Sequence, residues 1–184
     1  MPSPSHRYNF SDLDIIVVDD SEFALEIMRI IFAAMNIKKV RYCSSSVDCL
    51  AAIIKNLPDI VVVDLLMKPK NGYELIRRIR AHASEDIRHL PILVATAYSS
   101  APAIRLARDV GASEILCKPL SVEGVYDRFV HMRNHPRQFV KIAEYVGPDR
   151  RRTLRGFEGM DRRAGDTAGE LDANSEQKHA KEVR

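Results

Sequence analysis

The amino-acid sequence predicts an α/β protein with a doubly wound, five-stranded parallel sheet, followed by an extended or disordered C-terminal tail. Five short apolar runs alternate with five segments of helical periodicity between residues 12 and 136. The runs are apolar at almost every position, as in Ile60-Val61-Val62-Val63, which is typical of strands buried on both faces. Beyond Gly165 the chain is polar and nearly free of aromatic residues, which indicates disorder.

The individual elements are bounded by residues that favour a start or an end. Ser21 is a good N-cap for the first helix, in which apolar residues recur from Phe23 to Ala34. Gly111 suits the end of a helix, and His135-Pro136 ends the regular pattern, after which extended chain is expected to Val146. The strands are expected at 13–18, 40–43, 60–63, 91–95 and 115–117, and the other helices at 47–56, 73–81, 102–110 and 121–132.

The distribution of charge divides the chain into four segments. After an N-terminal tail, residues 1–11, residues 12–136 carry 16 basic and 16 acidic residues. Residues 137–165 carry eight basic and four acidic residues, whereas the tail 166–184 carries three basic and five acidic residues. We therefore expect a neutral domain with a basic extension that favours an anionic partner. Three residues are expected to anchor the extension on the domain: Phe139, Ile142 and Tyr145.

The sequence further predicts a cytoplasmic protein. The N-terminal residues lack the apolar core of a signal peptide, and no apolar stretch is long enough to span a bilayer, so no membrane insertion is expected. The three cysteines, Cys43, Cys49 and Cys117, are odd in number and lack metal-binding spacing. They are expected to be free thiols in a reducing compartment.

Polar residues stand at the carboxyl ends of four expected strands, where doubly wound sheets place their ligand sites. Asp19 and Asp20 follow the first strand, Asp64 the third, Thr96 the fourth and Lys118 the fifth. A single Asp in such a place is more simply a turn former or a helix cap, but the matched set favours a site. Three carboxylates at one edge require a cation such as Mg²⁺. One carboxylate can then attack phosphorus to form an aspartyl phosphate, whose oxygens a hydroxyl and an ammonium would bind.

This pattern resembles the receiver domain of bacterial response regulators, with the flavodoxin-like fold of the chemotaxis protein CheY, over about residues 12–135. The resemblance implies that Asp64 is the phosphoacceptor and that Asp19 and Asp20 hold Mg²⁺ with it. It implies that Thr96 is the switch hydroxyl and that Lys118 pairs with the phosphate. A histidine kinase is the implied phosphate source. Two further residues match the family: Gly72 after the acceptor loop and Pro119, whose peptide bond is usually cis.

The sequence departs from the family pattern around the phosphoacceptor. Ile115 stands where the family has its switch aromatic, and Lys68 stands where it often has a proline. Leu66 takes a usually polar position, and Tyr98 is a large residue two positions after the switch threonine. In the family, phosphorylation draws the threonine inward and the aromatic ring follows. Two interpretations therefore stay open, a phosphorylated receiver and a receiver retained as a docking scaffold.

Residues 147–163, GPDRRRTLRGFEGMDRR, contain Gly-x-Asp-Arg-Arg twice, with Asp149 and Asp161 twelve residues apart. The planar guanidinium fork binds phosphate or the O6/N7 edge of guanine with two hydrogen bonds. An Asp accepts from the N1–H and N2–H₂ of guanine, and Gly permits close backbone approach. Two copies suit two guanines or a twofold ligand. Cyclic di-GMP has two guanines, two phosphates and twofold symmetry, and it forms an intercalated dimer.

The strip also resembles the arginine-rich extension of the Cle family, CheY-like cyclic di-GMP effectors. The resemblance implies that the tail binds cyclic di-GMP. A segment without its own core typically becomes ordered only on binding. It further implies that the loaded protein engages the flagellar motor switch protein, at the flagellated pole, to control motility and surface attachment. The candidate ligand residues are Tyr145, Gly147, Pro148, Asp149, Arg150, Arg151, Arg152, Arg155, Gly159, Met160, Asp161, Arg162 and Arg163.

The sequence thus predicts a signalling adaptor without enzymatic activity of its own. The residues after Pro136 are too few, and too poor in amphipathic helices, for a helix-turn-helix output domain. Three alternatives stay open: a solvated basic tail, a nucleic-acid-binding tail and a single-domain response regulator phosphorylated at Asp64. Nucleic acid is the less favoured partner, because acidic residues embedded in the repeat disfavour binding to a general polyanion.

Overall fold

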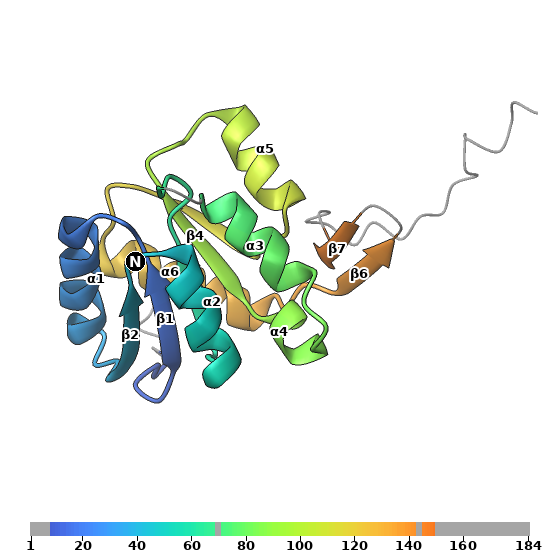
Figure 1. The fold of residues 1–184 in the computed structure, drawn as a ribbon. Coiled ribbons are helices and arrows are strands. Elements are labelled where there is room, and N and C mark those ends of the chain that lie inside the picture. The colour runs from blue at the N-terminus through green and yellow to red at the C-terminus, as the bar shows by residue number, and fades with distance from the viewer. Residues whose placement is uncertain (1–7, 69–70, 143–144, 150–184) are drawn as a thin grey trace, which may run out of the picture. The chain divides into compact units, whose positions relative to one another are not determined.

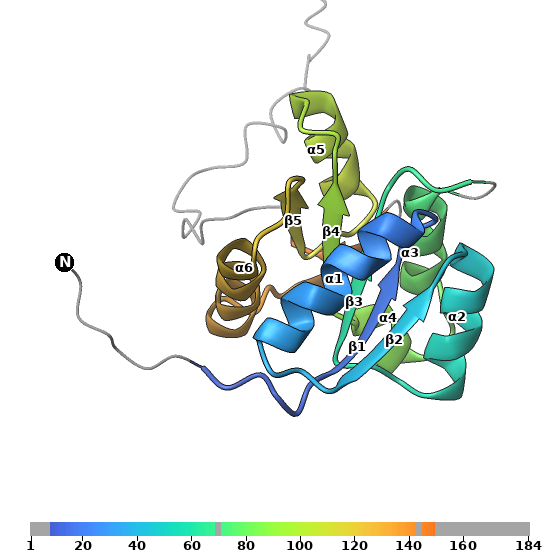
Figure 2. The same ribbon diagram turned by 90° about the vertical axis from the view of Figure 1, so that its left-hand side faces the viewer.

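A computed structural model describes residues 8–68, 71–142 and 145–149. Five parallel strands form one sheet in the order β2-β1-β3-β4-β5, with helices on both faces (Figures 1 and 2). This confirms the predicted fold class. The strands are β1 Asp14–Val18, β2 Lys39–Cys43, β3 Ile60–Val63, β4 Ile92–Thr96 and β5 Glu114–Cys117. The helices are α1 Glu22–Ala34, α2 Ser46–Lys55, α3 Gly72–Arg80, α4 Glu85–His89, α5 Ala101–Asp109 and α6 Val122–Asn134.

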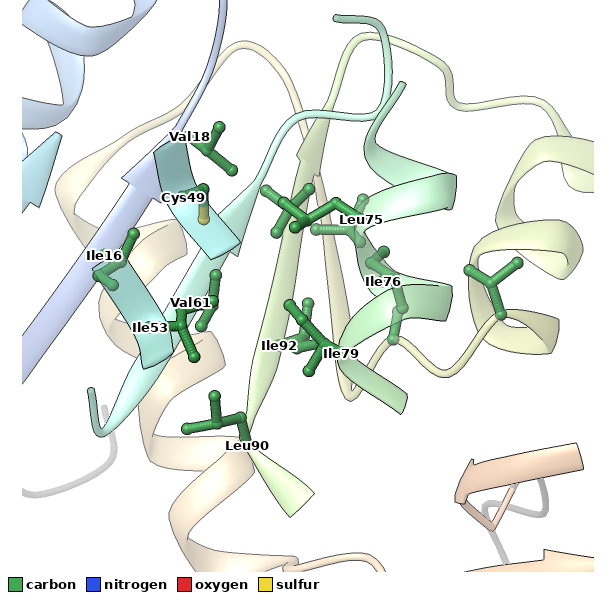
Figure 3. Close-up of a cluster of buried hydrophobic side chains, with 14 of the residues drawn as sticks. Ile16, Val18, Cys49, Ile53, Val61, Leu75, Ile76, Ile79, Leu90 and Ile92 are labelled. Carbon is green, nitrogen blue, oxygen red and sulfur yellow. The ribbon is translucent and has the colours of Figure 1, made fainter. Parts of the chain in front are cut away.

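Alternate residues of the central strands supply two separate hydrophobic cores. Ile16 and Val61 face helices α2 and α3, where Ile53 and Ile79 complete the packing (Figure 3). The residues that alternate with them along each strand point to the other face of the sheet, which α1 and α6 cover. Because both faces are buried, the strands need apolar residues throughout. The main side chains of the second core are Ile15, Val17, Val62, Leu93, Leu25, Phe32 and Phe129.

Polar caps explain where most of the helices begin. The side chains of Ser21, Ser45, Asn71, Ser100 and Ser121 each accept a hydrogen bond from the backbone N–H three residues later. Each cap satisfies a donor that the first helical turn leaves without an intrahelical partner. Each of these helices begins at the residue directly after its cap, so the caps set where the carboxyl-end loops stop.

Two elements extend the predicted pattern. The five-residue helix α4 lies between α3 and β4, with Ile87 buried. After Pro136 the chain forms an antiparallel hairpin of β6 Phe139–Ile142 and β7 Tyr145–Pro148. The expected extended conformation is therefore confirmed at 139–142 and 145–146, and so is anchoring by Phe139 and Tyr145. The side chain of Ile142 lies outside what the structure describes.

The segment before β1 packs on the second core. Phe10 is buried, and its ring makes edge contacts with Tyr126 and Phe129 at centroid distances of 5.5 and 5.7 Å. The hydroxyl of Tyr126 accepts a hydrogen bond from the Tyr8 backbone N–H at 2.7 Å. Within the described residues, no helix is both long enough and apolar enough to cross a membrane.

Truncation of the central aromatic side chain of α6 tests the second core. Phe129→Ala is expected to lower the free energy of unfolding by about 3–5 kcal/mol, since the cavity would lie between Phe10 and Phe32. Urea denaturation measures the effect. Phe23→Ala is the matched control, because Phe23 is 76% exposed and its loss should cost no more than about 0.5 kcal/mol. Equal losses in the two variants would contradict the assignment of the core.

Candidate phosphoacceptor site

The parallel register brings the predicted polar residues to one edge of the sheet. Val18 pairs with Val63, Val63 with Val94, and Thr96 with Cys117, so these strands end at closely matched levels. The residues that follow therefore meet at the carboxyl edge, as expected for a doubly wound sheet.

Lys118 joins the two buried carboxylates of this edge. Its Nζ donates hydrogen bonds to Asp19 Oδ2 at 2.8 Å and to Asp64 Oδ1 at 3.0 Å. Both aspartates are 6% exposed. Burial lowers the pKa of Lys118, but the hydrogen bonds and charges of Asp19 and Asp64 outweigh it, so the pKa lies above its ordinary value. The ammonium is thus charged at neutral pH and neutralises part of the negative charge at the edge.

Backbone donors hold the remaining carboxylate oxygens. Asp64 Oδ2 accepts from the Leu66 N–H at 2.7 Å, and Asp19 Oδ1 accepts from the Ser21 N–H at 2.9 Å. Lys118 is itself positioned by a bond from its N–H to the Thr96 carbonyl oxygen at 2.8 Å, and its peptide bond to Pro119 is cis, as the resemblance implies. The two buried carboxylates therefore have fixed orientations.

Asp20 lies at the same edge but is exposed. Its Oδ2 accepts from the Lys68 N–H at 3.0 Å and so ties the β1 end to the loop after β3. Three carboxylates are the oxygen donors that suit Mg²⁺, so the residues fit the ion in kind. In this conformation, however, Lys118 takes one oxygen each of Asp19 and Asp64. Within the described part of the chain, no group of three His, Cys, Asp or Glu residues is arranged to hold a metal.

Thr96 and Ile115 occupy the two positions that the resemblance assigns to the conformational switch. Thr96 is buried, and its Oγ1 accepts from the Tyr98 N–H at 3.1 Å. The Tyr98 side chain is 53% exposed, and Ile115 packs against the core between the sheet and α2, α3 and α5. Thr96 is therefore buried at the carboxyl edge, and the position of the family's switch aromatic holds a partly buried aliphatic side chain that packs against the core.

Gly72 is required by the close approach of α3 to the acceptor. A Cβ at this position would lie 2.1 Å from the Asp64 carbonyl oxygen and 2.9 Å from Leu65 Cα, both backbone atoms. The N–H of Gly72 also donates to the Leu65 carbonyl oxygen at 3.1 Å. The glycine that the resemblance singled out thus fixes the acceptor loop against the first turn of α3.

The predicted ligand residues of the C-terminal strip are described only at the start. The Tyr145 ring is buried and its hydroxyl donates to the Pro148 carbonyl oxygen at 2.7 Å, so in this conformation it offers no face for base stacking. Gly147 and Pro148 are buried in β7, and the Asp149 N–H donates to the Gln138 carbonyl oxygen. The rest lie outside the described residues: Arg150, Arg151, Arg152, Arg155, Gly159, Met160, Asp161, Arg162 and Arg163.

Two buried charged residues were not anticipated from the sequence. Arg80, at the end of α3, and Glu114, at the start of β5, are 3% and 2% exposed. Arg80 stands in a basic helix end with Arg77 and Arg78, but it follows Ile76 by four residues and so lies on the apolar face of α3, and this helical spacing separates it from its two exposed neighbours. Both buried residues contact the segment that leads into the arginine strip, namely Phe139 and Arg137.

Comparison with known proteins identifies the class. Residues 15–129 match the response regulator receiver domain family, and this chain belongs to that family. The response regulator MprA of Mycobacterium sp. (strain KMS) is 34% identical over 114 residues, which are 62% of this chain and 47% of that protein. The sensory/regulatory protein RpfC of Xanthomonas campestris is 26% identical over 160 residues, 86% of this chain and 21% of that protein. The chain spans less than half the length of these curated relatives.

Solved structures show the same fold. A putative response regulator from Chloroflexus aurantiacus J-10-fl has a TM-score of 0.59 at 29% identity, covering 65% of this chain and 94% of the other. The chemotaxis protein CheY4 of Vibrio cholerae has a TM-score of 0.59 at 22% identity, covering 65% and 97%. The matched region is the receiver, in which Mg²⁺ commonly serves the phosphorylation site and histidine kinases are the usual partners.

Removal of the bridging ammonium tests the charge balance of the site. Lys118→Met leaves Asp19 and Asp64 close together without their shared cation, and we expect a loss of about 2 kcal/mol in unfolding free energy at pH 7 without added metal. The loss should shrink when Mg²⁺ is added or when the pH is lowered enough to protonate the carboxylates. Thermal unfolding with EDTA and with Mg²⁺ measures this. A loss that neither Mg²⁺ nor acid reduces would contradict the electrostatic account.

Proposed function

We propose that this chain is a cyclic di-GMP-responsive signalling adaptor with a CheY-like receiver and without enzymatic activity. The arginine strip binds the second messenger, as an intercalated dimer, and the loaded protein engages the flagellar motor switch to control motility and surface attachment. The observation that carries this proposal is the duplicated Gly-x-Asp-Arg-Arg of residues 147–163, because arginine and aspartate together complement the edges of guanine.

The position of the first copy supports the proposal. β7 contains Gly147 and Pro148 and contacts α4, so the first copy begins in a strand that is packed on the receiver. The receiver can therefore present the strip and, through its own faces, meet a protein target. In CheY relatives the target face corresponds to α5, β5 and α6, and we assign the motor contact to this face by that analogy.

Calorimetric titration of cyclic di-GMP into the full chain tests this function. We expect micromolar or tighter binding at near-physiological salt, lost when Arg151, Arg152, Arg162 and Arg163 are changed to Ala. The matched control changes four exposed cations of the receiver to Ala: Lys38, Lys39, Arg77 and Arg105. Binding that the control weakens equally, or that GTP or short DNA reproduces, would indicate a general polyanion surface. Absence of binding would refute the function.

A second function, phosphotransfer, is favoured by the acceptor geometry. Asp64 is fixed by Lys118 and by the Leu66 N–H, with Thr96 beside it at the same edge. We expect acetyl phosphate with Mg²⁺ to add one phosphoryl group to the wild-type chain and none to Asp64→Asn, as measured by intact mass and phosphate-affinity electrophoresis. Unlabelled wild-type protein would favour the role of a docking scaffold.

A further inference from the structure

The hairpin that leads into the arginine strip is built around a buried guanidinium. Nε and Nη2 of Arg80 donate to the Gly111 carbonyl oxygen at 3.0 and 2.8 Å, and Nη1 donates to the carbonyl oxygens of Leu90 and Arg88. Arg80 therefore ties the end of α3 to the turn after α4 and to the turn between α5 and β5. Its charge is satisfied largely by backbone dipoles, and burial lowers its pKa to about 10, so it stays charged at neutral pH.

The hairpin covers this guanidinium. The ring of Phe139 lies 5.1 Å from the Arg80 guanidinium and 4.1 Å from the ring of His89 on α4. On the second strand, a Cβ at Gly147 would lie only 3.2 Å from the Cα of Gly111. β7 therefore abuts the turn between α5 and β5, and a Cβ at Gly147 would also lie 2.5 Å from the Tyr145 hydroxyl oxygen, so both neighbours favour a glycine at this position. Figure 1 shows both strands of the hairpin on the side of the molecule where α4 lies.

A second buried charge holds the root of the hairpin. Glu114, the first residue of β5, meets Arg137 at 3.3 Å, and Arg128 and His131 of α6 at 3.6 and 3.2 Å. The hairpin is thus anchored at Gly111 through Arg80 and at Glu114 through Arg137. Gly111 lies within the short turn that joins α5 to β5, and Glu114 follows that turn directly, so both anchors are close to it.

The hairpin also borders open space. A cavity of about 590 Å³ lies beside its root, at the amino edge of the sheet. Phe139 and Pro148 line it together with Phe10, Phe129 and Arg137. Close-packed interiors resist small displacements, whereas an element that borders a cavity can shift without displacing core side chains. The hairpin therefore has firm contacts at two points and room to move elsewhere.

We propose that ligand captured by the arginines after Asp149 acts on the receiver through the β6–β7 hairpin, and that Arg80 is the positioning residue that couples the hairpin to the α5–β5 turn. This inference rests on the proposed function. The first Gly-x-Asp-Arg-Arg copy begins inside the hairpin. Its glycine, Gly147, packs against Gly111, and the N–H of its Asp149 donates to the Gln138 carbonyl oxygen. On the proposed function, the ligand binds the arginines that follow Asp149, so the hairpin connects the ligand-binding segment to the α5–β5 turn.

Hydrogen–deuterium exchange of the full chain, with and without cyclic di-GMP, tests the coupling. In the wild type, we expect ligand to slow exchange in residues 137–149 and also at 110–117. Phe139→Ala removes the ring from Arg80 but leaves the bonds of Arg80 to the receiver carbonyls. The variant is expected to bind the ligand within about tenfold of wild type, a change of about 1.4 kcal/mol at most. The ligand-induced protection at 110–117 should be lost.

One control and one further test variant separate coupling from general instability. Phe23→Ala removes an exposed ring from the opposite helix α1 and should preserve the protection at 110–117. Arg80→Lys keeps the charge but loses the planar guanidinium that donates two hydrogen bonds to the Gly111 carbonyl oxygen. Like Phe139→Ala, it should lose the ligand-induced protection at 110–117. The coupling would be overturned if ligand-induced protection at 110–117 persisted in both Phe139→Ala and Arg80→Lys. It would also be overturned if this protection were absent in the wild type despite ligand binding.

The ligand-free comparison keeps this inference distinct from the proposed function. Without ligand, Phe139→Ala should exchange faster than wild type at 110–117, because the hairpin no longer rests on Arg80. If the wild type binds no cyclic di-GMP, the proposed function fails, and faster exchange in the variant would still support control of the turn by the hairpin. Unchanged exchange at 110–117 in the ligand-free variant would refute that control.

Discussion

The arrangement of the C-terminal segment depends on one buried cation. Arg80 uses three donor groups to hold carbonyl oxygens from two separate turns, and its outer face receives the Phe139 ring. A buried charge that loses its partners is costly, since the full desolvation penalty then remains. The turns and the hairpin strands are therefore held together as a group, and both β6 and β7 are packed on the receiver.

The two edges of the sheet carry different buried charges. At the carboxyl edge, Lys118 joins Asp19 and Asp64 in a site suited to receive a phosphoryl group. At the amino side, Arg80 and Glu114 anchor the segment that leads to the strip. β5 spans both regions, since Glu114 begins it and Lys118 follows it. The same strand thus leads from the anchor of the proposed ligand-binding segment to the candidate phosphoacceptor site.

The sequence predicted the sheet and its site because strand burial and strand ends leave local signals. Ile60–Val63 is apolar at every position, and each polar end residue follows such a run directly. The helix α4 was missed because five residues show no periodicity. The pairing of β6 with β7 was missed because the hairpin packs on Arg80, Gly111 and His89. These residues are far apart in the chain and leave no local signal. In the sequence, Gly147 is compatible both with close packing and with close approach of a ligand. Only the structure shows that it packs against Gly111.

The receiver and the arginine strip together form one signalling unit in this account. The most direct measurement is an NMR titration of the isotopically labelled full chain with cyclic di-GMP, recording backbone amide shifts. The account predicts changes throughout 149–163, with a second group at 110–117 and in the hairpin. Changes confined to the edge around Asp64, or a spectrum that the ligand leaves unaltered, would contradict it.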